Sequence, residues 1–221
     1  ISLLLTVLSI FYIMLPLLLK GHDPMLITIL VSILITAVTL LLVSGFNKKT
    51  LAAVLGTTGG LVAAGILAKF IGNTAKLTGL GTEESQMLLY IPQNINFDYR
   101  GLLFAGILLG ALGACMDVGL SLSSAIFEIK ENNPELNRVQ LFKSGMNIGR
   151  DMMGTMSNTL ILAYVGGSLP LLILFIAHQM PLSEIINQDG FAGEIIRSLA
   201  GSIGLILTIP LTNLVAGFFC D

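Results

Sequence analysis

Long apolar runs separated by short polar segments make up most of the chain. The runs cover residues 1–19, 25–43, 51–71, 100–130, 152–177 and 191–219. Each is close to the roughly 20 residues that a helix needs to cross a bilayer core of about 30 Å, and helices satisfy their own backbone hydrogen bonds in lipid. The pattern therefore predicts an all-α, polytopic transmembrane helix bundle with about six spans.

Polar and helix-breaking segments between these runs refine the picture. The sequence Gly-Gly-Ser-Leu-Pro at residues 166–170 interrupts the fifth run. It predicts either one kinked span or a span followed by a re-entrant segment, which would give seven spans. The polar intervals at residues 72–99 and 131–147 each contain an amphipathic stretch, so we expect short interfacial helices there.

The fourth run carries a stripe of small and polar residues. In steps of three and four, which keep to one side of a helix, the stripe contains Gly106, Gly110, Gly113, Asp117, Ser121, Ser124 and Glu128. At about 1.5 Å per residue, Asp117 lies roughly 16 Å from each end of the run, near the middle of the membrane. A carboxyl group at that depth is costly and indicates a function.

A second polar stripe covers the residues just before the fifth run and its first residues. It contains Asn147, Arg150, Asp151, Thr155 and Asn158. We expect this helix to be antiparallel and adjacent to the Asp117 helix, with a hydrophilic seam between the two. Counting helical rises from the membrane edge places Arg150 and Asp151 near the level of residues 124–128, and Asn158 closer to Asp117.

Two interpretations of this seam remain open. In the first, a proton, cation or substrate path is lined by Asp117, Ser121, Ser124, Thr155 and Asn158, and the candidates for an ion pair or gate are Glu128, Arg150, Asp151 and Asn147. In the second, the same side chains only hold helices together. A neutral amide would serve that purpose as well as Asp117 without the desolvation penalty, which favours the first interpretation.

Small residues at intervals of four predict close approach of helices in lipid. Gly56 and Gly60 have this spacing in the third run, and Gly106, Gly110 and Gly113 contribute small positions to the fourth. We expect all five to be helix-packing positions.

The composition agrees with a membrane protein and excludes several other classes. Hydrophobic residues make up 54% and charged residues 11% of the 221 residues, and the net charge is −2. That charge leaves no basic face for nucleic acid. The sequence has no HExxH motif and no Cys/His cluster, so we expect no metal, no cofactor and no enzymatic activity. The start at Ile1, inside an apolar run, predicts a fragment of a longer protein.

Basic residues in the short connections predict the orientation. Placing residues 131–150 in the cytoplasm puts six basic residues on that side, namely Lys48, Lys49, Lys130, Arg138, Lys143 and Arg150. The other side then has three, Lys20, Lys76 and Arg100. We therefore expect a multi-pass protein of a cytoplasmic (plasma) membrane with residues 131–150 cytoplasmic.

Three stretches of the sequence resemble the YibE/F-like family of bacterial membrane proteins. They are Gly-Ala-Leu-Gly-Ala-Cys-Met-Asp-Val at residues 110–118, Ser144 through Tyr164, and Gly-Gly-Ser-Leu-Pro at 166–170. The resemblance extends over nearly the whole chain. It implies an additional N-terminal span and an extracytoplasmic domain outside this single transmembrane domain of residues 1–221, and it names a fold family more than a function.

A more distant similarity is to the SecF-like membrane half of the resistance-nodulation-division superfamily. It implies a membrane-embedded acid and a facing basic residue that serve proton-driven conformational change. Arg150 stands at the matching basic position, whereas Ser124 stands at the acid's position and Asp117 lies seven residues earlier. At about 1.5 Å per residue this predicts that Asp117 is roughly 10 Å too deep to pair with Arg150.

Taken together, these features predict a transporter-like membrane protein that is proton- or cation-coupled through Asp117. The alternative is a non-transporting scaffold or assembly factor whose polar seam only packs helices. The expected partners are the lipid bilayer and either a second copy of the chain or another membrane protein. The small molecule or ion that would be transported cannot be read from the sequence.

Overall fold

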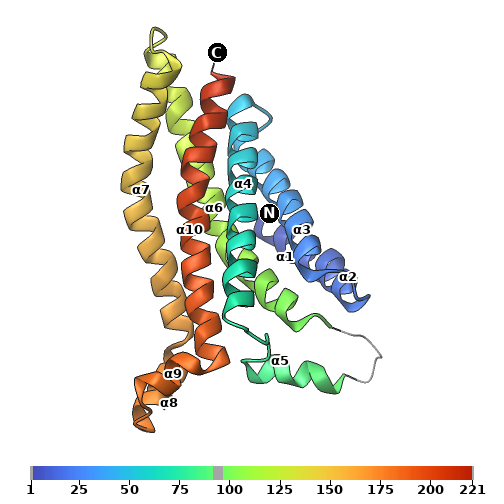
Figure 1. The fold of residues 1–221 in the computed structure, drawn as a ribbon. Coiled ribbons are helices and arrows are strands. Elements are labelled where there is room, and N and C mark those ends of the chain that lie inside the picture. Colours follow the sequence, from blue (N-terminus) through green and yellow to red (C-terminus); the bar gives the residue numbers. More distant parts are fainter. Residues whose placement is uncertain (1, 92–96, 221) are drawn as a thin grey trace.

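The chain folds into a bundle of long helices, and the short helices within residues 83–90 and 169–187 lie at one end of it (Figure 1). The computed structural model describes residues 2–91 and 97–220, and within them there are helices and no strand. The long helices are α3 (Pro24–Ser44), α4 (Lys48–Thr74), α6 (Tyr99–Asn132), α7 (Arg138–Gly167) and α10 (Asp189–Phe219). The shorter ones are α1 (Ser2–Ser9), the π-helix η1 (Ile10–Met14), α2 (Leu15–Leu19), α5 (Glu83–Met87), the 3₁₀ helix η2 (Leu88–Tyr90), α8 (Leu169–Ala177) and α9 (Leu182–Asn187).

The number of spans agrees with the prediction. In the described part of the chain, five helical segments are long and apolar enough to cross a membrane: Ser2–Leu19, α3, α4, α6 and α10. A sixth span results if α7 and α8 are taken together, although they meet at an angle of 56°. The chain is therefore an all-α, polytopic bundle with five or six spans, and the helix breaks between α7 and α8 at the Gly-Gly-Ser-Leu-Pro sequence.

Polar residues in the connections determine where the long helices begin. Asp23, Asn47, Asp98 and Asn137 stand directly before α3, α4, α6 and α7, and each side chain accepts a hydrogen bond from a backbone N–H of the first turn, at 2.8–2.9 Å. These bonds satisfy donors that have no partner inside the helix. Short polar sequences therefore separate helices that apolar composition alone would run together.

The start of α7 differs from the sequence prediction. We expected an interfacial helix within residues 131–147 and a separate span from Met152, but α7 runs unbroken from Arg138 to Gly167. Asn137 and Gln140 form a reciprocal capping box that begins the helix at Arg138. Nothing after this cap stops the helix, so the amphipathic stretch and the span are one element. The other expected short helix is present as α5.

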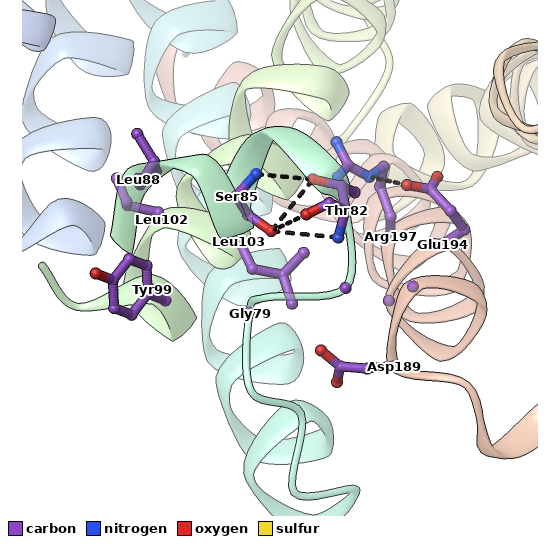
Figure 2. Close-up of a pocket in the computed structure, with 13 residues that line it drawn as sticks. Gly79, Thr82, Ser85, Leu88, Tyr99, Leu102, Leu103, Asp189, Glu194 and Arg197 are labelled. Carbon is purple, nitrogen blue, oxygen red and sulfur yellow. Dashed lines mark hydrogen bonds and ion pairs between the residues drawn. The ribbon is translucent and has the colours of Figure 1, made fainter. Parts of the chain in front are cut away.

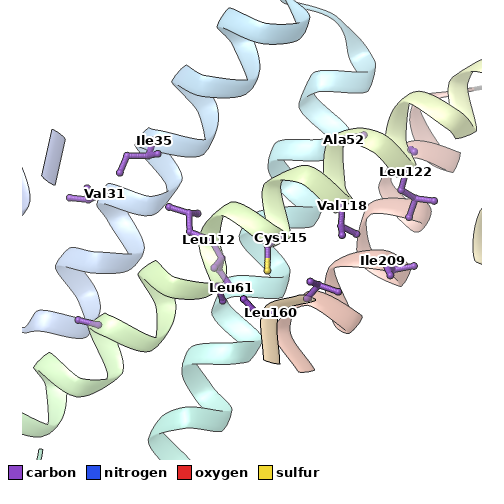
Figure 3. Close-up of a cluster of buried hydrophobic side chains, with 14 of the residues drawn as sticks. Val31, Ile35, Ala52, Leu61, Leu112, Cys115, Val118, Leu122, Leu160 and Ile209 are labelled. Atoms are coloured by element: carbon purple, nitrogen blue, oxygen red, sulfur yellow. The ribbon is translucent and has the colours of Figure 1, made fainter. Parts of the chain in front are cut away.

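The core lies where α4, α6 and α10 meet. Apolar side chains from these helices and from α3 form its main cluster, including Ile35, Leu61, Val118 and Ile209 (Figure 3). α4 and α10 come closest: a Cβ on Gly56 would overlap Thr212, and a Cβ on Gly60 would overlap Thr208. Gly56 and Gly60 are thus packing positions, as predicted.

The helix α7 lies at the edge of the bundle, beside α10 and on the side opposite α3 (Figure 1). Only four of its 30 residues are buried, Leu141, Gly145, Gly149 and Leu160, whereas α10 buries twelve of 31. α7 therefore presents most of its circumference to the surroundings. It contains most of the polar residues that the sequence places within the membrane.

Candidate functional site

Most of the predicted site residues lie on one exposed side of the bundle, formed by α6 and α7. We call this surface the lateral polar face. Its exposed members are Gly110, Gly113, Asp117 and Ser121 of α6, and Asn147, Arg150, Asp151, Gly154 and Asn158 of α7. The polar stripe of each helix is thus open to the surroundings in a single chain, where the sequence predicted a closed seam between the two helices.

Asp117 and Arg150 both flank the junction between α6 and α7. This junction is marked by Gly110, whose Cβ position lies 2.8 Å from the Tyr164 hydroxyl. Asp117 follows Gly110 by seven residues and so projects within about 20° of it, while Arg150 precedes Tyr164 by fourteen and projects within about 40°. The acid of α6 and the base of α7 therefore belong to the same side of the bundle.

Contacts with α10 establish the relative depth of α6 and α7. A Cβ on Gly119 of α6 would lie 3.7 Å from the methyl carbon of Thr208, and a Cβ on Gly149 of α7 would overlap Ile209. Thr208 and Ile209 are consecutive residues of α10. Gly119 and Gly149 consequently lie at nearly the same depth in the bundle.

This register brings Asp117 to the level of Arg150. Asp117 is two residues from Gly119, or about 3 Å along the axis, and Arg150 is one residue from Gly149, about 1.5 Å in the same direction because the helices are antiparallel. The predicted offset of roughly 10 Å between Asp117 and Arg150 is therefore wrong. It assumed that the membrane-crossing helix began near Asn147, whereas α7 begins at Arg138.

The charged groups of the lateral polar face have no polar partner within the described residues. Neither Asp117 nor Arg150 forms a hydrogen bond or ion pair there, and the ion pair considered between Glu128 and Arg150 is absent. Glu128 is exposed and accepts a hydrogen bond from the Asn132 amide at 3.0 Å. An acid and a base thus stand at one membrane depth without neutralising each other.

The remaining predicted path residues are distributed unevenly. Ser121 and Asn158 are exposed, and Ser124 is half-buried. Thr155 is exposed as well, but it lies five residues after Arg150, about 140° around α7. Its hydroxyl donates to backbone carbonyls of its own helix at 3.2 and 3.3 Å. Thr155 therefore does not line the same surface as Asp117 and Arg150.

The glycines of α6 have different environments. A Cβ on Gly106 would lie 3.6 Å from the Arg197 guanidinium, and one on Gly110 would contact Tyr164, so both glycines pack within the chain. For Gly113 no atom lies within 4 Å of that position. The predicted packing role of Gly113 is thus not filled by the described part of the chain, because this side of α6 is left open.

A pocket of about 170 Å³, lined by both apolar and charged side chains, lies at the end of the bundle near α5 and α9 (Figure 2). It contains an ion pair between Arg197 Nε and Glu194 Oε1 at 3.3 Å, with both side chains about three-quarters buried. Asp189 lines the pocket and accepts hydrogen bonds from the backbone and hydroxyl of Thr78 at 3.0 and 2.6 Å. The pocket is therefore held between the loop after α4 and the start of α10.

The sequence interpretation missed this pocket, although a signal for it was present. Glu194 and Arg197 lie three residues apart at the beginning of an apolar run, a spacing that allows ion pairing on a helix. Arg197 also contacts the position of Gly106, where the stripe of α6 begins. The pocket and the lateral polar face therefore meet at Arg197, about 16 Å along α6 from Asp117.

Residues 2–91 and 97–220 contain no group of three His, Cys, Asp or Glu side chains that could hold a metal ion. Cys115 is buried, and its neighbour on the wall of α4 is Thr57, whose hydroxyl donates to the Cys115 carbonyl at 3.3 Å. Two exposed acids, Asp117 and Asp151, lie close to the level of Arg150.

Comparison with known proteins identifies the family. The family model described as YibE/F-like protein matches residues 1–221, so the chain belongs to the YibE/F-like family. No curated protein and no solved structure matches the chain. The resemblance read from the sequence is thereby confirmed.

Proposed function

We propose that this member of the YibE/F-like family is a transporter-like membrane protein that is proton- or cation-coupled through Asp117. The observation that carries the proposal is the position of Asp117, near the middle of α6 on an exposed side, with no partner among the described residues. Ionisable side chains within membrane spans are rare because they are costly, and they mark ion and proton pathways. Asp117 would bind and release the coupling ion.

The pocket lined by Glu194 and Arg197 supplies an entrance to such a path. Its ion pair of Glu194 and Arg197 borders Gly106, and from there the small residues of the α6 stripe lead to Asp117. Glycines leave room beside the helix for water or an ion, since they have no side chain. The basic-residue bias favours an extracytoplasmic position for the pocket, and we propose that the ion enters there and reaches Asp117 after about 16 Å.

Proton flux into liposomes tests this proposal. The purified protein is reconstituted with a pH-sensitive dye inside the liposomes, and a pH gradient is imposed across the membrane. We expect that Asp117→Asn lowers the flux to that of empty liposomes, because the amide cannot exchange a proton, while the yield of folded protein is unchanged. The control Glu135→Gln removes an exposed acid in the turn before α7 and should retain wild-type flux.

The open lateral polar face also supports the alternative, a scaffold or assembly factor that uses this surface to bind another membrane protein. The same experiment separates the two functions. If Asp117→Asn is folded and carries wild-type flux, Asp117 is not the coupling group. If the wild-type protein itself gives no more flux than empty liposomes with gradients of either direction, proton coupling is wrong and the scaffold function is favoured.

A further inference from the structure

The charged residues of the lateral polar face would be unfavourable in contact with lipid. Asp117 and Arg150 are exposed on the side of a membrane-crossing bundle, where the surrounding lipid offers no hydrogen bonds. An uncompensated charge in that environment costs several kcal/mol or more. A folded protein in a membrane would keep such a surface against other protein.

We infer that the lateral polar face of a second copy of this chain covers it, with Asp117 of each copy facing Arg150 of the other. Two copies in a membrane are related by a two-fold axis along the membrane normal, and such an axis preserves the depth of every residue. A self-complementary surface must therefore carry its acid and its base at the same depth. Asp117 and Arg150 meet this condition through their shared register on α10.

The residues on either side of this charge layer satisfy the same condition. One layer is formed by Gly113 of α6 and Gly154 of α7, which lie about 9 Å and 7.5 Å from Gly119 and Gly149 in the same direction. Neither glycine has an atom within 4 Å of its Cβ position. Two bare glycines at one depth allow a partner's backbone to come close.

The other layer is polar. Ser121 and Asn147 each lie two residues from the reference glycines, toward the turn between α6 and α7, and both are exposed. Hydroxyl and amide groups at equal depth can hydrogen-bond across a two-fold axis. The lateral polar face thus presents three matched layers, which a lipid-facing surface does not need.

The dimer adds a second copy to the proposed coupling site. Only the role of Asp117 in coupling rests on the proposed function. With Arg150 of the second copy opposite it, the carboxylate of Asp117 is neutralised in the ion-free state, and its protonation would release Arg150. Asp151, exposed one residue after Arg150, is the other acid at this level. The coupling site would then be complete only in the dimer. The association itself is a separate claim and can be measured without any transport.

Charge reversal in separate copies tests the association. Donor- and acceptor-labelled full chains are reconstituted together in liposomes, and energy transfer is measured while lipid is added. We expect Asp117→Arg and Arg150→Asp each to weaken self-association by at least about tenfold, because like charges then face each other. Mixing the two variants should restore wild-type association, since every facing pair is again one acid and one base.

Two further chains keep the test decisive. A chain carrying both reversals should self-associate like the wild type, and Glu135→Arg, in the turn outside the face, should have no effect. If single reversals lower the folded yield, Ser121→Cys and Asn147→Cys in separate copies lacking Cys115 and Cys220 should form an intermolecular disulfide on oxidation with the charges intact.

Four results would overturn the dimer. These are a monomeric wild type at high protein density, failure of the mixed variants to associate, failure of the folded double variant to associate, and failure of the Ser121→Cys and Asn147→Cys chains to cross-link with each other. Each leaves the flux experiment unaffected, so dimerisation without flux rejects the proposed function alone, and flux without dimerisation rejects the second copy alone.

Discussion

Two surfaces of this bundle have similar composition and opposite environments. The first, between α4 and α10, joins Gly56 and Gly60 to Thr208 and Thr212, and we call it the closed seam. Its threonines are fully buried, and Thr208 donates to the Gly204 carbonyl of its own helix at 2.9 Å. The lateral polar face likewise combines glycines with polar side chains, yet it is exposed. Small and polar residues in a membrane helix thus indicate close approach without telling whether the partner lies in the same chain.

Charge is what separates the two surfaces. The polar groups of the closed seam are uncharged hydroxyls: that of Thr208 donates to a carbonyl of its own helix, and that of Thr212 has no hydrogen-bond partner among the described residues. The lateral polar face carries Asp117 and Arg150, and neither charged group has a hydrogen bond or an ion pair among the described residues. The first surface can be complete within one chain, while the second needs another protein surface or an ion.

The largest expected effect on stability comes from a substitution that separates the two helices of the closed seam. In Gly60→Leu, the Cβ atom alone would overlap the Thr208 side chain and lie 2.8 Å from the Gly204 carbonyl oxygen. Both groups belong to α10 and cannot move aside without shifting that helix. We expect a loss of about 3 kcal/mol or more in unfolding free energy, since overpacking without room to relax separates the helices. Thermal unfolding in detergent and the yield of monodisperse protein measure it.

A wild-type melting temperature for Gly60→Leu would show that α4 and α10 are not in contact at this depth. Gly60→Ala provides a graded comparison. Even its single methyl would overlap the Thr208 hydroxyl, so it should destabilise the protein less than leucine but in the same direction.

A smaller effect is expected at the attachment of α7 to α10. The fully buried Asn213 donates from its side-chain amide to the Phe142 carbonyl of α7 at 2.8 Å. Asn213→Ala removes this interhelical bond, and we expect a loss of about 1 kcal/mol in unfolding free energy, as is usual for such bonds in membranes. Chemical unfolding in mixed micelles measures the difference.

The matched control for Asn213 is Asn158, which is exposed on α7 and has no hydrogen bond among the described residues. Asn158→Ala should change the stability of the detergent-solubilised single chain by less than about 0.5 kcal/mol. Equal effects of the two substitutions would mean that the Asn213 bond does not hold α7 in place.

The sequence was sufficient for the fold class because hydrophobic run length is a strong signal in membrane proteins. The six runs, the break at residues 166–170 and the seam at Gly56 and Gly60 all appear in the structure. The register between α6 and α7 could not be counted correctly, since it depended on the start of α7 at a capping box in an interval expected to be a separate helix.

The sequence also could not predict whether the polar stripes are buried or exposed. Periodicity shows that Asp117, Ser121 and Glu128 share a side of α6, but the side that faces the core is decided by packing with α4 and α10. Asn213 was overlooked because it stands in an apolar run and its partner lies on another helix. Arg197 pairs with Glu194 on its own helix, a spacing that the sequence interpretation did not use.

The smallest expected effect on unfolding is at Gly113, and it makes the comparison sharpest. Gly113→Leu adds a side chain in the same membrane-helix context as Gly60→Leu, but no atom lies within 4 Å of its Cβ position. The melting temperature of the monomeric, detergent-solubilised protein should therefore stay within about 1 °C of the wild type. In liposomes the same substitution should weaken association between labelled copies, because a leucine would hold the partner's backbone away from the charge layer. A Gly113→Leu protein that associates like the wild type would place the contact between copies elsewhere, whereas one that unfolds as readily as Gly60→Leu would mean that this side of α6 is already covered within the chain.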